Sequence, residues 1–335
     1  MQQDLVTPGR SVRRWSWIAT FLVATGCSGP QSVLHAAGSD ARALLTLFIV
    51  MLVGLVVIWV LVNGLMLVFN RLETGEHDER LARRLIVGGG ILFPTVVLTA
   101  LLVWGLSIMP DQRAPGDGLR VEVTGEQWWW RVSYWPEGAE TPIVAANEIR
   151  LPVGQRTEFD LKSAHVIHSF WIPSLGGKMD MFPGRDTMMS LEPTEAGVFR
   201  GQCAEFCGAS HALMAFDVVA MEQADFDAWL AAQAEPAAAP EGAAARRGAQ
   251  VFAEQGCGAC HAVRGTAAVG LMGPDLTHVG SRLTLGAGIL APTLENYADW
   301  IAHTGDIKPE VEMPAYTTLA DADLSALSTY LMGLK

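Results

Sequence analysis

Two long stretches without a charged residue stand out in the first third of the chain. They run from Ala43 to Phe69 and from Leu85 to Met109. At a rise of about 1.5 Å per residue, a helix over either stretch exceeds the roughly 30 Å hydrocarbon thickness of a bilayer. Buried helices of a soluble protein, the alternative interpretation, are rarely so long and so free of charge. The pattern therefore predicts a transmembrane helical hairpin within residues 27–110.

The connection between the two stretches is rich in arginine: Arg71, Arg80, Arg83 and Arg84. Short arginine-rich loops stay in the cytoplasm. The residues after Met109 are therefore expected on the periplasmic or extracellular face of a bacterial inner (plasma) membrane. That compartment permits disulfides and covalent haem attachment.

The first 26 residues have the pattern of a targeting segment. Three arginines precede the short apolar run IATFLVA, and TGC follows it and ends at Cys27. A positive region, a short apolar region and a processing site are typical of a signal peptide. The cysteine also resembles a lipoprotein processing site, although Ala24 stands where that pattern usually has leucine. Residues 1–26 are therefore predicted to be a signal peptide of plain or lipoprotein type.

After Met109 the pattern changes from helical to strand-like. Segments such as LRVEVTGEQWWWRVSYW and TEFDLKSAHVIHSFWIP are rich in valine, threonine and aromatic residues, and they partly alternate in polarity between turns with Gly and Pro. Several short strands at this spacing predict an all-β sandwich or barrel over residues 111–230.

An alanine- and proline-rich stretch, AAQAEPAAAPEGAAA, follows at residues 231–245. It has no aromatic or β-branched residue to bury, which favours a flexible linker. Three helical patterns then flank a glycine-rich middle and predict a small all-α domain at residues 246–335: RRGAQVFAEQ, LENYADWIAH and DADLSALSTYLMGL. The net charge of -12 argues against a nucleic-acid partner but permits a basic protein partner.

The segment GCGACH places Cys257, Cys260 and His261 at the C-x-x-C-H spacing of a c-type haem attachment site. Two thiols can form thioethers with the two vinyl groups, while the adjacent imidazole reaches the iron. A zinc site needs a second ligand pair and a redox C-x-x-C needs a thioredoxin-like setting, and neither pattern is present in the sequence. The segment predicts one covalently bound haem c.

The second axial ligand of this haem is expected well downstream of the motif. Met313, in EMPAY, is the preferred candidate because the following proline stiffens the loop that holds its thioether. Met272, in LMGP, competes with it, with a gap-filling core role as its alternative. His278 and His303 are further candidates. Methionine–histidine ligation raises the haem potential and suits electron transfer rather than oxygen binding.

The segment CAEFCGASHALM, from Cys203 to Met214, gathers two of the five cysteines with a histidine and a methionine. Thiolates, imidazoles and a thioether form the ligand set of copper electron-transfer sites. A mononuclear site needs one cysteine, so two at C-x-x-x-C favour a pair of bridged metals, with His211 on the same loop. IHSFW offers His168 to complete the set. A zinc site would leave Met214 unused, and a disulfide would leave both histidines without a role.

Together with VIHSFWIPSLGGKMD, and with GEQWWW after a two-span hairpin, this segment closely resembles subunit II of cytochrome c oxidase. The resemblance extends from about Cys27 to Trp229. The haem domain resembles the cytochrome c that is fused to subunit II in caa-type haem-copper oxidases. The resemblance implies a cupredoxin-like sandwich with a dinuclear CuA centre, followed by a class I cytochrome c domain.

The resemblance also assigns roles to individual residues. It implies bridging by Cys203 and Cys207, terminal ligation by His168 and His211, and weak axial donation by Met214 and the Glu205 carbonyl. The Glu205 carboxylate would face a magnesium site shared with subunit I. Trp128, the first of three tryptophans on a predicted strand, would be the residue through which electrons enter, with an ordinary core position as its alternative.

Two positions depart from the family pattern. His165 stands where an aspartate usually precedes the upstream copper histidine, which puts the docking of an external basic cytochrome c in doubt. Val87 stands about where many relatives carry a glutamate at the start of the second span. A contribution to proton uptake at that position is therefore not supported.

These patterns predict the electron-input subunit of a terminal cytochrome c oxidase. Electrons from cytochrome c or another donor would pass through haem c and CuA to a haem-copper subunit that reduces oxygen to water and pumps protons. This chain is then an enzyme only as part of that complex. The alternatives are the CuA subunit of a nitric oxide reductase and a copper-delivery protein. A quinol oxidase subunit, which lacks copper ligands, is excluded.

Overall fold

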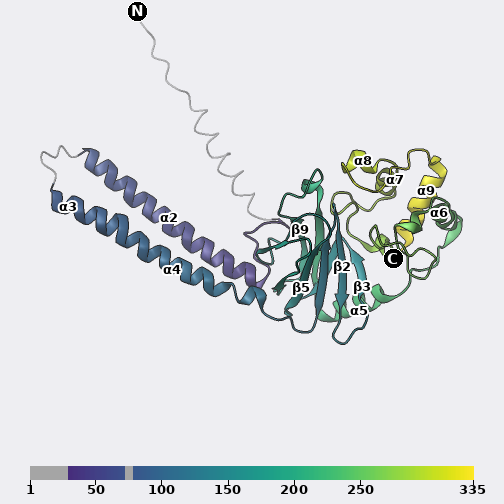
Figure 1. Ribbon diagram of the computed structural model, residues 1–335, viewed down its shortest axis with the longest axis horizontal. Coiled ribbons are helices and arrows are strands. Elements are labelled where there is room, and N and C mark those ends of the chain that lie inside the picture. Colours follow the sequence, from purple (N-terminus) through teal and green to yellow (C-terminus); the bar gives the residue numbers. More distant parts are fainter. Residues whose placement is uncertain (1–28, 72–77) are drawn as a thin grey trace, which may run out of the picture.

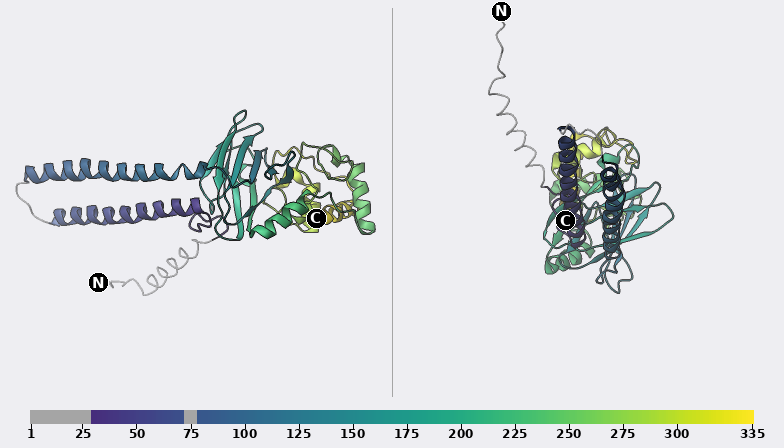
Figure 2. Two further views of the ribbon diagram at one scale, coloured as in Figure 1. Left: turned by 90° about the horizontal axis from the view of Figure 1, so that it is seen from below. Right: turned by 90° about the vertical axis from the view of Figure 1, so that its left-hand side faces the viewer.

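The computed structural model describes residues 29–71 and 78–335 in three parts. A long helical hairpin, a β-sandwich and a small helical domain follow one another along the molecule (Figure 1). Figure 2 shows the hairpin on one side of the sandwich and the helical domain on the other. The predicted signal peptide, its arginines and Cys27 lie outside the described residues. The multidomain fold class predicted from the sequence is confirmed.

The hairpin consists of two helical rods. The first is α2 (Ser39–Arg71), and the second combines α3 (Glu79–Arg84), the π-helix η2 (Leu85–Leu92) and α4 (Phe93–Ile108). The most apolar 18-residue segments of the two rods have mean hydropathies of 3.1 and 2.3, and none of their residues is buried by the rest of the protein. Both rods can therefore cross a membrane by length and composition. Val87 lies in the wide turns of η2, which also hold three consecutive glycines.

A half-buried arginine joins the start of α2 to the sandwich. The Arg156 guanidinium lies 3.1 Å from Asp40 Oδ2 and 3.1 Å from Ser190 Oγ, and Asp40 is 3% exposed. A Cβ at Gly38 would lie 2.3 Å from Leu175 O, so only glycine permits this close approach. Charge pairing and close packing therefore define where the hairpin joins the sandwich.

The sandwich has two five-stranded mixed sheets. One has the order β3-β2-β1-β5-β8 and the other β4-β10-β9-β6-β7. The strands are β1 (Arg120–Gly125), β2 (Trp130–Trp135), β3 (Ile143–Ala146), β4 (Glu148–Pro152), β5 (Thr157–Ser163), β6 (His168–Trp171), β7 (Lys178–Met181), β8 (Thr187–Leu191), β9 (Gly197–Cys203) and β10 (Ala215–Met221). Trp130, Phe170 and Phe216 form a core cluster with ring centroids 5.0–5.9 Å apart.

The prediction that all three tryptophans lie on one strand is wrong. Only Trp130 belongs to a strand, the first residue of β2, where it is fully buried. Trp128 and Trp129 lie in the connection from β1, because Glu126 and Trp129 form a backbone turn in which Glu126 N–H donates to Trp129 O at 3.0 Å. Trp129 instead stacks under the Arg131 guanidinium, 4.7 Å from the ring centroid.

The predicted C-terminal helices are present. The segment after the sandwich contains α5 (Gln223–Ala234), α6 (Gly242–Glu254), α7 (Leu294–Ala302), α8 (Thr304–Ile307) and α9 (Asp321–Gly333). α5 still packs on the sandwich, with the Trp229 ring 5.2 Å from that of Tyr134. α6 crosses α9 so closely that a Cβ at Gly248 would lie 2.0 Å from Ala326 O.

Helices extend into both ends of the linker that was predicted at residues 231–245. α5 ends at Ala234 and α6 begins at Gly242, because alanine is a strong helix former. The non-helical part between them contacts the helical domain: Ala237 N–H donates to Arg264 O at 3.0 Å, and Glu235 O lies 3.0 Å from His278 Nε2. The connection between the two domains is thus hydrogen-bonded to the helical domain.

Candidate copper and haem sites

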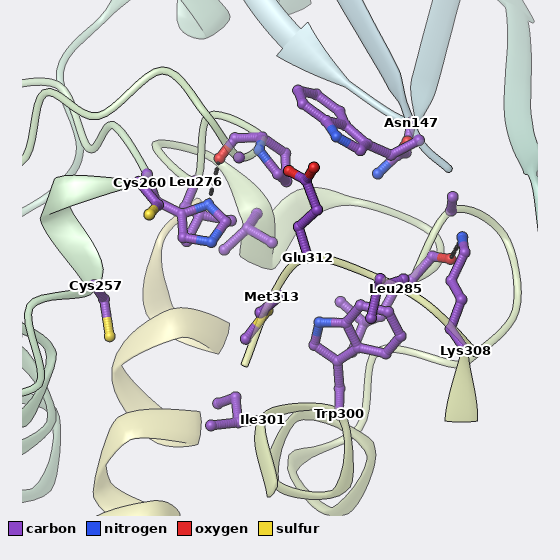
Figure 3. Close-up of a pocket in the computed structure, with 18 of the residues that line it drawn as sticks. Asn147, Cys257, Cys260, Leu276, Leu285, Trp300, Ile301, Lys308, Glu312 and Met313 are labelled. Carbon is purple, nitrogen blue, oxygen red and sulfur yellow. Dashed lines mark hydrogen bonds between the residues drawn. The ribbon is translucent and has the colours of Figure 1, made fainter. Parts of the chain in front are cut away.

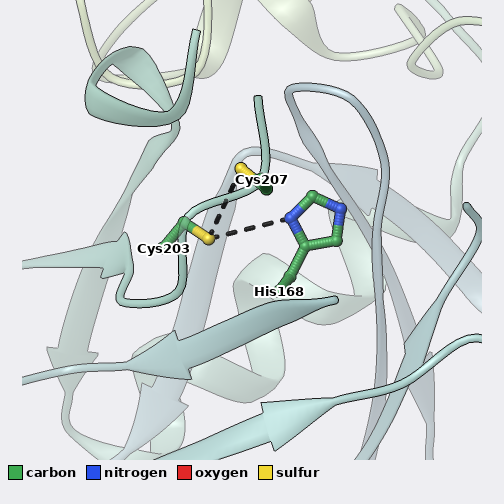
Figure 4. A group of neighbouring side chains, drawn as sticks. All are labelled: His168, Cys203 and Cys207. Atoms are coloured by element: carbon green, nitrogen blue, oxygen red, sulfur yellow. Dashed lines mark hydrogen bonds between the residues drawn. The ribbon is translucent and has the colours of Figure 1, made fainter. Parts of the chain in front are cut away.

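The loop from the end of β9 to the start of β10 brings the predicted copper ligands together. The two cysteine sulfurs lie 3.8 Å apart, each beside a histidine nitrogen: Cys203 Sγ is 3.7 Å from His168 Nδ1, and Cys207 Sγ is 3.6 Å from His211 Nδ1. Figure 4 shows three of these side chains converging. Met214 Sδ lies 3.9 Å from Cys207 Sγ, and Cys203 Sγ lies 3.1 Å from Glu205 O.

The strands determine part of this geometry. His168 begins β6 and Cys203 ends β9, and these two strands are paired. His168 is fully buried, and its Nε2 has no hydrogen-bond partner among residues 29–71 and 78–335. A Cβ at Gly125 would lie 2.7 Å from the His168 ring, so glycine is needed to admit the imidazole.

The first of the two cysteine thiols loses its proton easily, and the second loses its proton only with difficulty. The pKa of Cys203 is lowered, first because the Cys207 thiol donates to its thiolate. The pKa of Cys207 is raised by the same hydrogen bond and by burial. Two thiolates at this separation therefore need a bound cation to balance them.

The donor set fits a pair of copper ions better than the alternatives. A sulfur separation of 3.8 Å is far from the roughly 2.05 Å of a disulfide, and both cysteines are free. Two neighbouring sulfurs, each with a histidine nitrogen beside it, match two bridged metals. A tetrahedral zinc site would leave the buried Met214 thioether without a role.

The haem attachment motif lies at the edge of a large pocket in the helical domain. Cys257 and Cys260 are half-buried at η5 (Cys257–Ala259), and Figure 3 shows them with Met313 around the pocket. His261 Nδ1 lies 2.8 Å from Pro274 O, so it donates there and leaves Nε2 as the ligating nitrogen. Burial lowers the pKa of His261, which favours the neutral imidazole that a metal needs. The residues present thus fit a c-type haem.

The structure separates the candidates for the second axial ligand. Met313 lines the pocket and packs against the buried core of the helical domain. Met272 also lines the pocket but is 69% exposed. His278 is held at Glu235 O, and His303 caps the end of α7, and neither lines the pocket. These placements favour Met313.

The pocket is shared between the two domains. Its lining continues from the haem motif onto the sandwich at Gln127, Trp128, Trp129 and Asn147. The Trp128 indole N–H donates to Cys207 O at 3.0 Å, and Trp128 is only 4% exposed. The helical domain therefore covers the residue through which electrons were expected to enter.

A further residue at the meeting of the two domains, Lys308, has no distinguishing pattern in the sequence. This lysine directly follows α8, and its ammonium bonds to backbone carbonyls of both domains while 2% of the residue is exposed. Burial lowers its pKa to about 7. A lone lysine in the polar segment HTGDIKPE is expected to be exposed, so no local signal marks it.

Fold and sites together define a class of protein: a cupredoxin-like domain on a membrane-capable hairpin, carrying a c-type haem domain. Residues 136–221 match the family model "Cytochrome C oxidase subunit II, periplasmic domain", and residues 245–335 match the cytochrome c family model. The chain is 34% identical to cytochrome c oxidase subunit 2 of Alkalihalophilus pseudofirmus over 96% of this chain and 95% of that protein. The chain belongs to the cytochrome c oxidase subunit 2 family.

Other relatives are similar over shorter lengths. Cytochrome c oxidase subunit 2 of Bacillus subtilis is 35% identical over 73% of this chain and 70% of that protein. The crystal structure of the periplasmic domain of cytochrome oxidase subunit II from Bradyrhizobium japonicum is 28% identical, with a TM-score of 0.31. It covers 36% of this chain and 95% of that one.

Proposed function

We propose that this chain is the electron-input subunit of a terminal cytochrome c oxidase, and that its own haem domain is the immediate donor to its copper site. One observation carries this proposal: a single pocket is lined by the haem attachment motif on one side and by Trp128 on the other. Trp128 in turn donates to the backbone carbonyl of the ligand Cys207.

Each site has its own set of ligands in this proposal. Copper would be held by His168, Cys203, Glu205, Cys207, His211 and Met214, and haem c by Cys257, Cys260, His261 and Met313. When bound, both groups would supply one-electron chemistry. The protein holds the donor side chains in fixed positions, so electron transfer would need little rearrangement of the protein.

Trp128 is the residue through which electrons enter the copper site in this proposal. Its indole lies between the haem pocket and the copper loop, and its N–H contacts a ligand residue directly. Because the helical domain covers it, an external cytochrome c would deliver electrons to that domain rather than to Trp128. The exposed His165 is compatible with this role, since the sandwich then needs no carboxylate there for an external donor.

Two neighbouring residues of the copper loop are exposed and could contact the catalytic subunit. Glu205 is exposed, and Phe206 is 76% exposed with its ring 5.8 Å from that of His211. An exposed aromatic ring beside a metal ligand suits a protein contact. We propose that haem-copper subunit I docks here, that the Glu205 carboxylate serves a shared magnesium ion, and that subunit I reduces oxygen and pumps protons.

The two membrane-capable rods suit an anchored subunit. The proposal places their arginine-rich connection in the cytoplasm and both redox domains on the periplasmic or extracellular face. Isolating the membrane complex from the native organism and identifying its large subunit tests the function. An oxygen-reducing haem-copper subunit that consumes oxygen with reduced cytochrome c supports the proposal. A partner that reduces nitric oxide but not oxygen contradicts it.

A further inference from the structure

A buried lysine joins the haem domain to the copper domain. The Lys308 ammonium donates to Trp128 O at 2.7 Å, to Leu213 O at 2.8 Å and to Gly286 O at 2.8 Å (Figure 3 shows Lys308 at the pocket). Two of these acceptors belong to the sandwich and the third to the helical domain. An ammonium has three N–H donors, so this set satisfies it completely.

The acceptors of this ammonium are parts of the copper site's surroundings. Leu213 directly precedes the ligand Met214, and the Trp128 side chain donates to Cys207 O. Lys308 also begins the loop that carries Met313 into the haem pocket. One short segment thus contacts the copper loop at its start and supplies the proposed haem ligand further on.

Further hydrogen bonds join the domains on either side of Lys308. Ser210, beside the ligand His211, donates to Pro309 O at 2.6 Å. Ala215 N–H donates to Ala287 O at 3.0 Å, and Arg200 donates to Gly288 O at 2.8 Å. Lys308 therefore lies at the centre of a polar interface and is its most deeply buried charge.

The physical effect of this lysine depends on whether the domains are docked. In the docked arrangement the Lys308 ammonium donates to three carbonyl oxygens at the interface. Without the lysine these oxygens would be buried without a hydrogen-bond donor, which is energetically costly. In a separated arrangement water would serve the same carbonyls. Removing the ammonium therefore disfavours docking specifically, while each domain keeps its own core.

We propose that Lys308 is a positioning residue that locks the haem domain onto the copper loops, thereby setting the rate of electron transfer between them and closing Trp128 to external redox partners. This inference rests on the proposed function only for the transfer itself, in which the haem loses one electron and the copper pair gains it. No bond forms or breaks. Lys308 acts through the Trp128 and Leu213 carbonyls.

The test compares Lys308→Met with Lys335→Met, a change at an exposed lysine of the same domain. Both are made in the full chain loaded with copper and haem. Amide exchange at Ala215, which donates across the interface, reports docking, with the sandwich amide of Val218 as internal control. The rate of copper reduction after photoreduction of the haem is measured with and without glycerol.

Lys308→Met should speed exchange at Ala215 and slow internal electron transfer, each by about tenfold, because leaving a buried acceptor without its partner costs an energy of that order. The slow transfer should depend on viscosity, while the haem and copper spectra stay unchanged. Lys335→Met should behave like the unsubstituted chain. Lys308→Gln, which keeps two N–H donors, should fall between the two.

Unchanged exchange and unchanged, viscosity-independent transfer in Lys308→Met would overturn the role of Lys308. If Lys308→Met does not fold, Lys308→Gln decides by the same two readouts. If the unsubstituted chain itself shows no transfer from haem to copper, the proposed function fails. The amide exchange of Ala215 then still decides whether Lys308 docks the domains.

Discussion

The copper site and the haem pocket are built in opposite ways. Four of the six proposed copper-ligand residues are buried, all six belong to one domain, and five of them lie within Cys203–Met214. The paired strands β6 and β9 already set the distance from Cys203 to His168. The haem donors extend from Cys257 to Met313 around an open pocket, part of whose wall belongs to the other domain. The sandwich therefore prearranges its site, whereas the helical domain encloses its site only with help from the sandwich.

The largest effect is expected from removing a bridging sulfur. Cys207→Ser should abolish copper binding and leave one covalent haem per chain, because the two ligand sets share no residue. Elemental analysis of the loaded chain should fall from two coppers per haem to none. Zinc, or one copper per haem in the fully loaded unsubstituted chain, would contradict the dinuclear assignment.

The haem pocket should respond to its axial methionine in a different way. Met313→Ala should keep the covalent haem, lower its potential by on the order of 0.1 V, and open the iron to added imidazole, because the thioether favours ferrous iron. Redox titration and ligand-binding spectra measure both effects. Met272→Ala is the matched control, and the assignment is wrong if it opens the haem while Met313→Ala does not.

The core of the helical domain can be weakened without touching either site. In Gly248→Ala the new Cβ would lie 2.0 Å from Ala326 O, so overpacking should lower the free energy of unfolding of this domain by about 1–3 kcal/mol. Denaturation followed by haem absorption measures it. Gly333→Ala, whose Cβ meets nothing within 4 Å, should cause no such loss. Equal effects of the two would refute the close crossing of α6 and α9.

The smallest effect is expected at the indole above the copper loop. Trp128→Phe keeps a ring there but loses the hydrogen bond to Cys207 O, which should destabilise the copper-loaded sandwich by about 0.5–1.5 kcal/mol. Thermal unfolding followed by copper absorption measures this loss. Trp129→Phe serves as control because the Trp129 ring stacks on Arg131 instead. If Trp129→Phe lowered the stability of the sandwich more than Trp128→Phe, the hydrogen bond to Cys207 O would not be the stabilising contact.

The sequence predicted the parts of the structure that local spacing encodes. The two apolar stretches, the C-x-x-C-H motif and the cluster Cys203–Met214 are each recognisable within a short window. His168 lies 35 residues before Cys203. It was nevertheless predicted as a ligand, because the copper site needed a second imidazole and the segment IHSFW supplies one. Its position at the start of β6, beside β9, explains why this distant residue reaches the site.

The rest depends on contacts between distant segments. Lys308 bonds to Trp128 across 180 positions, and nothing in its own surroundings indicates burial. Trp128 and Trp129 lie outside the strand because Glu126 and Trp129 form a turn, and the non-helical part of residues 231–245 is hydrogen-bonded to the distant Arg264. Periodicity and composition describe a segment alone, so they could not predict how the two domains meet.

The central claim is that the fused haem reduces the copper site directly. The most direct measurement is photoreduction of the haem in the full chain loaded with both cofactors, at several protein concentrations, with haem and copper absorption followed together. The account predicts that haem oxidation and copper reduction proceed at one common rate that does not change with protein concentration. Copper that stays oxidised beside reduced haem, or a rate that rises with protein concentration, would contradict it.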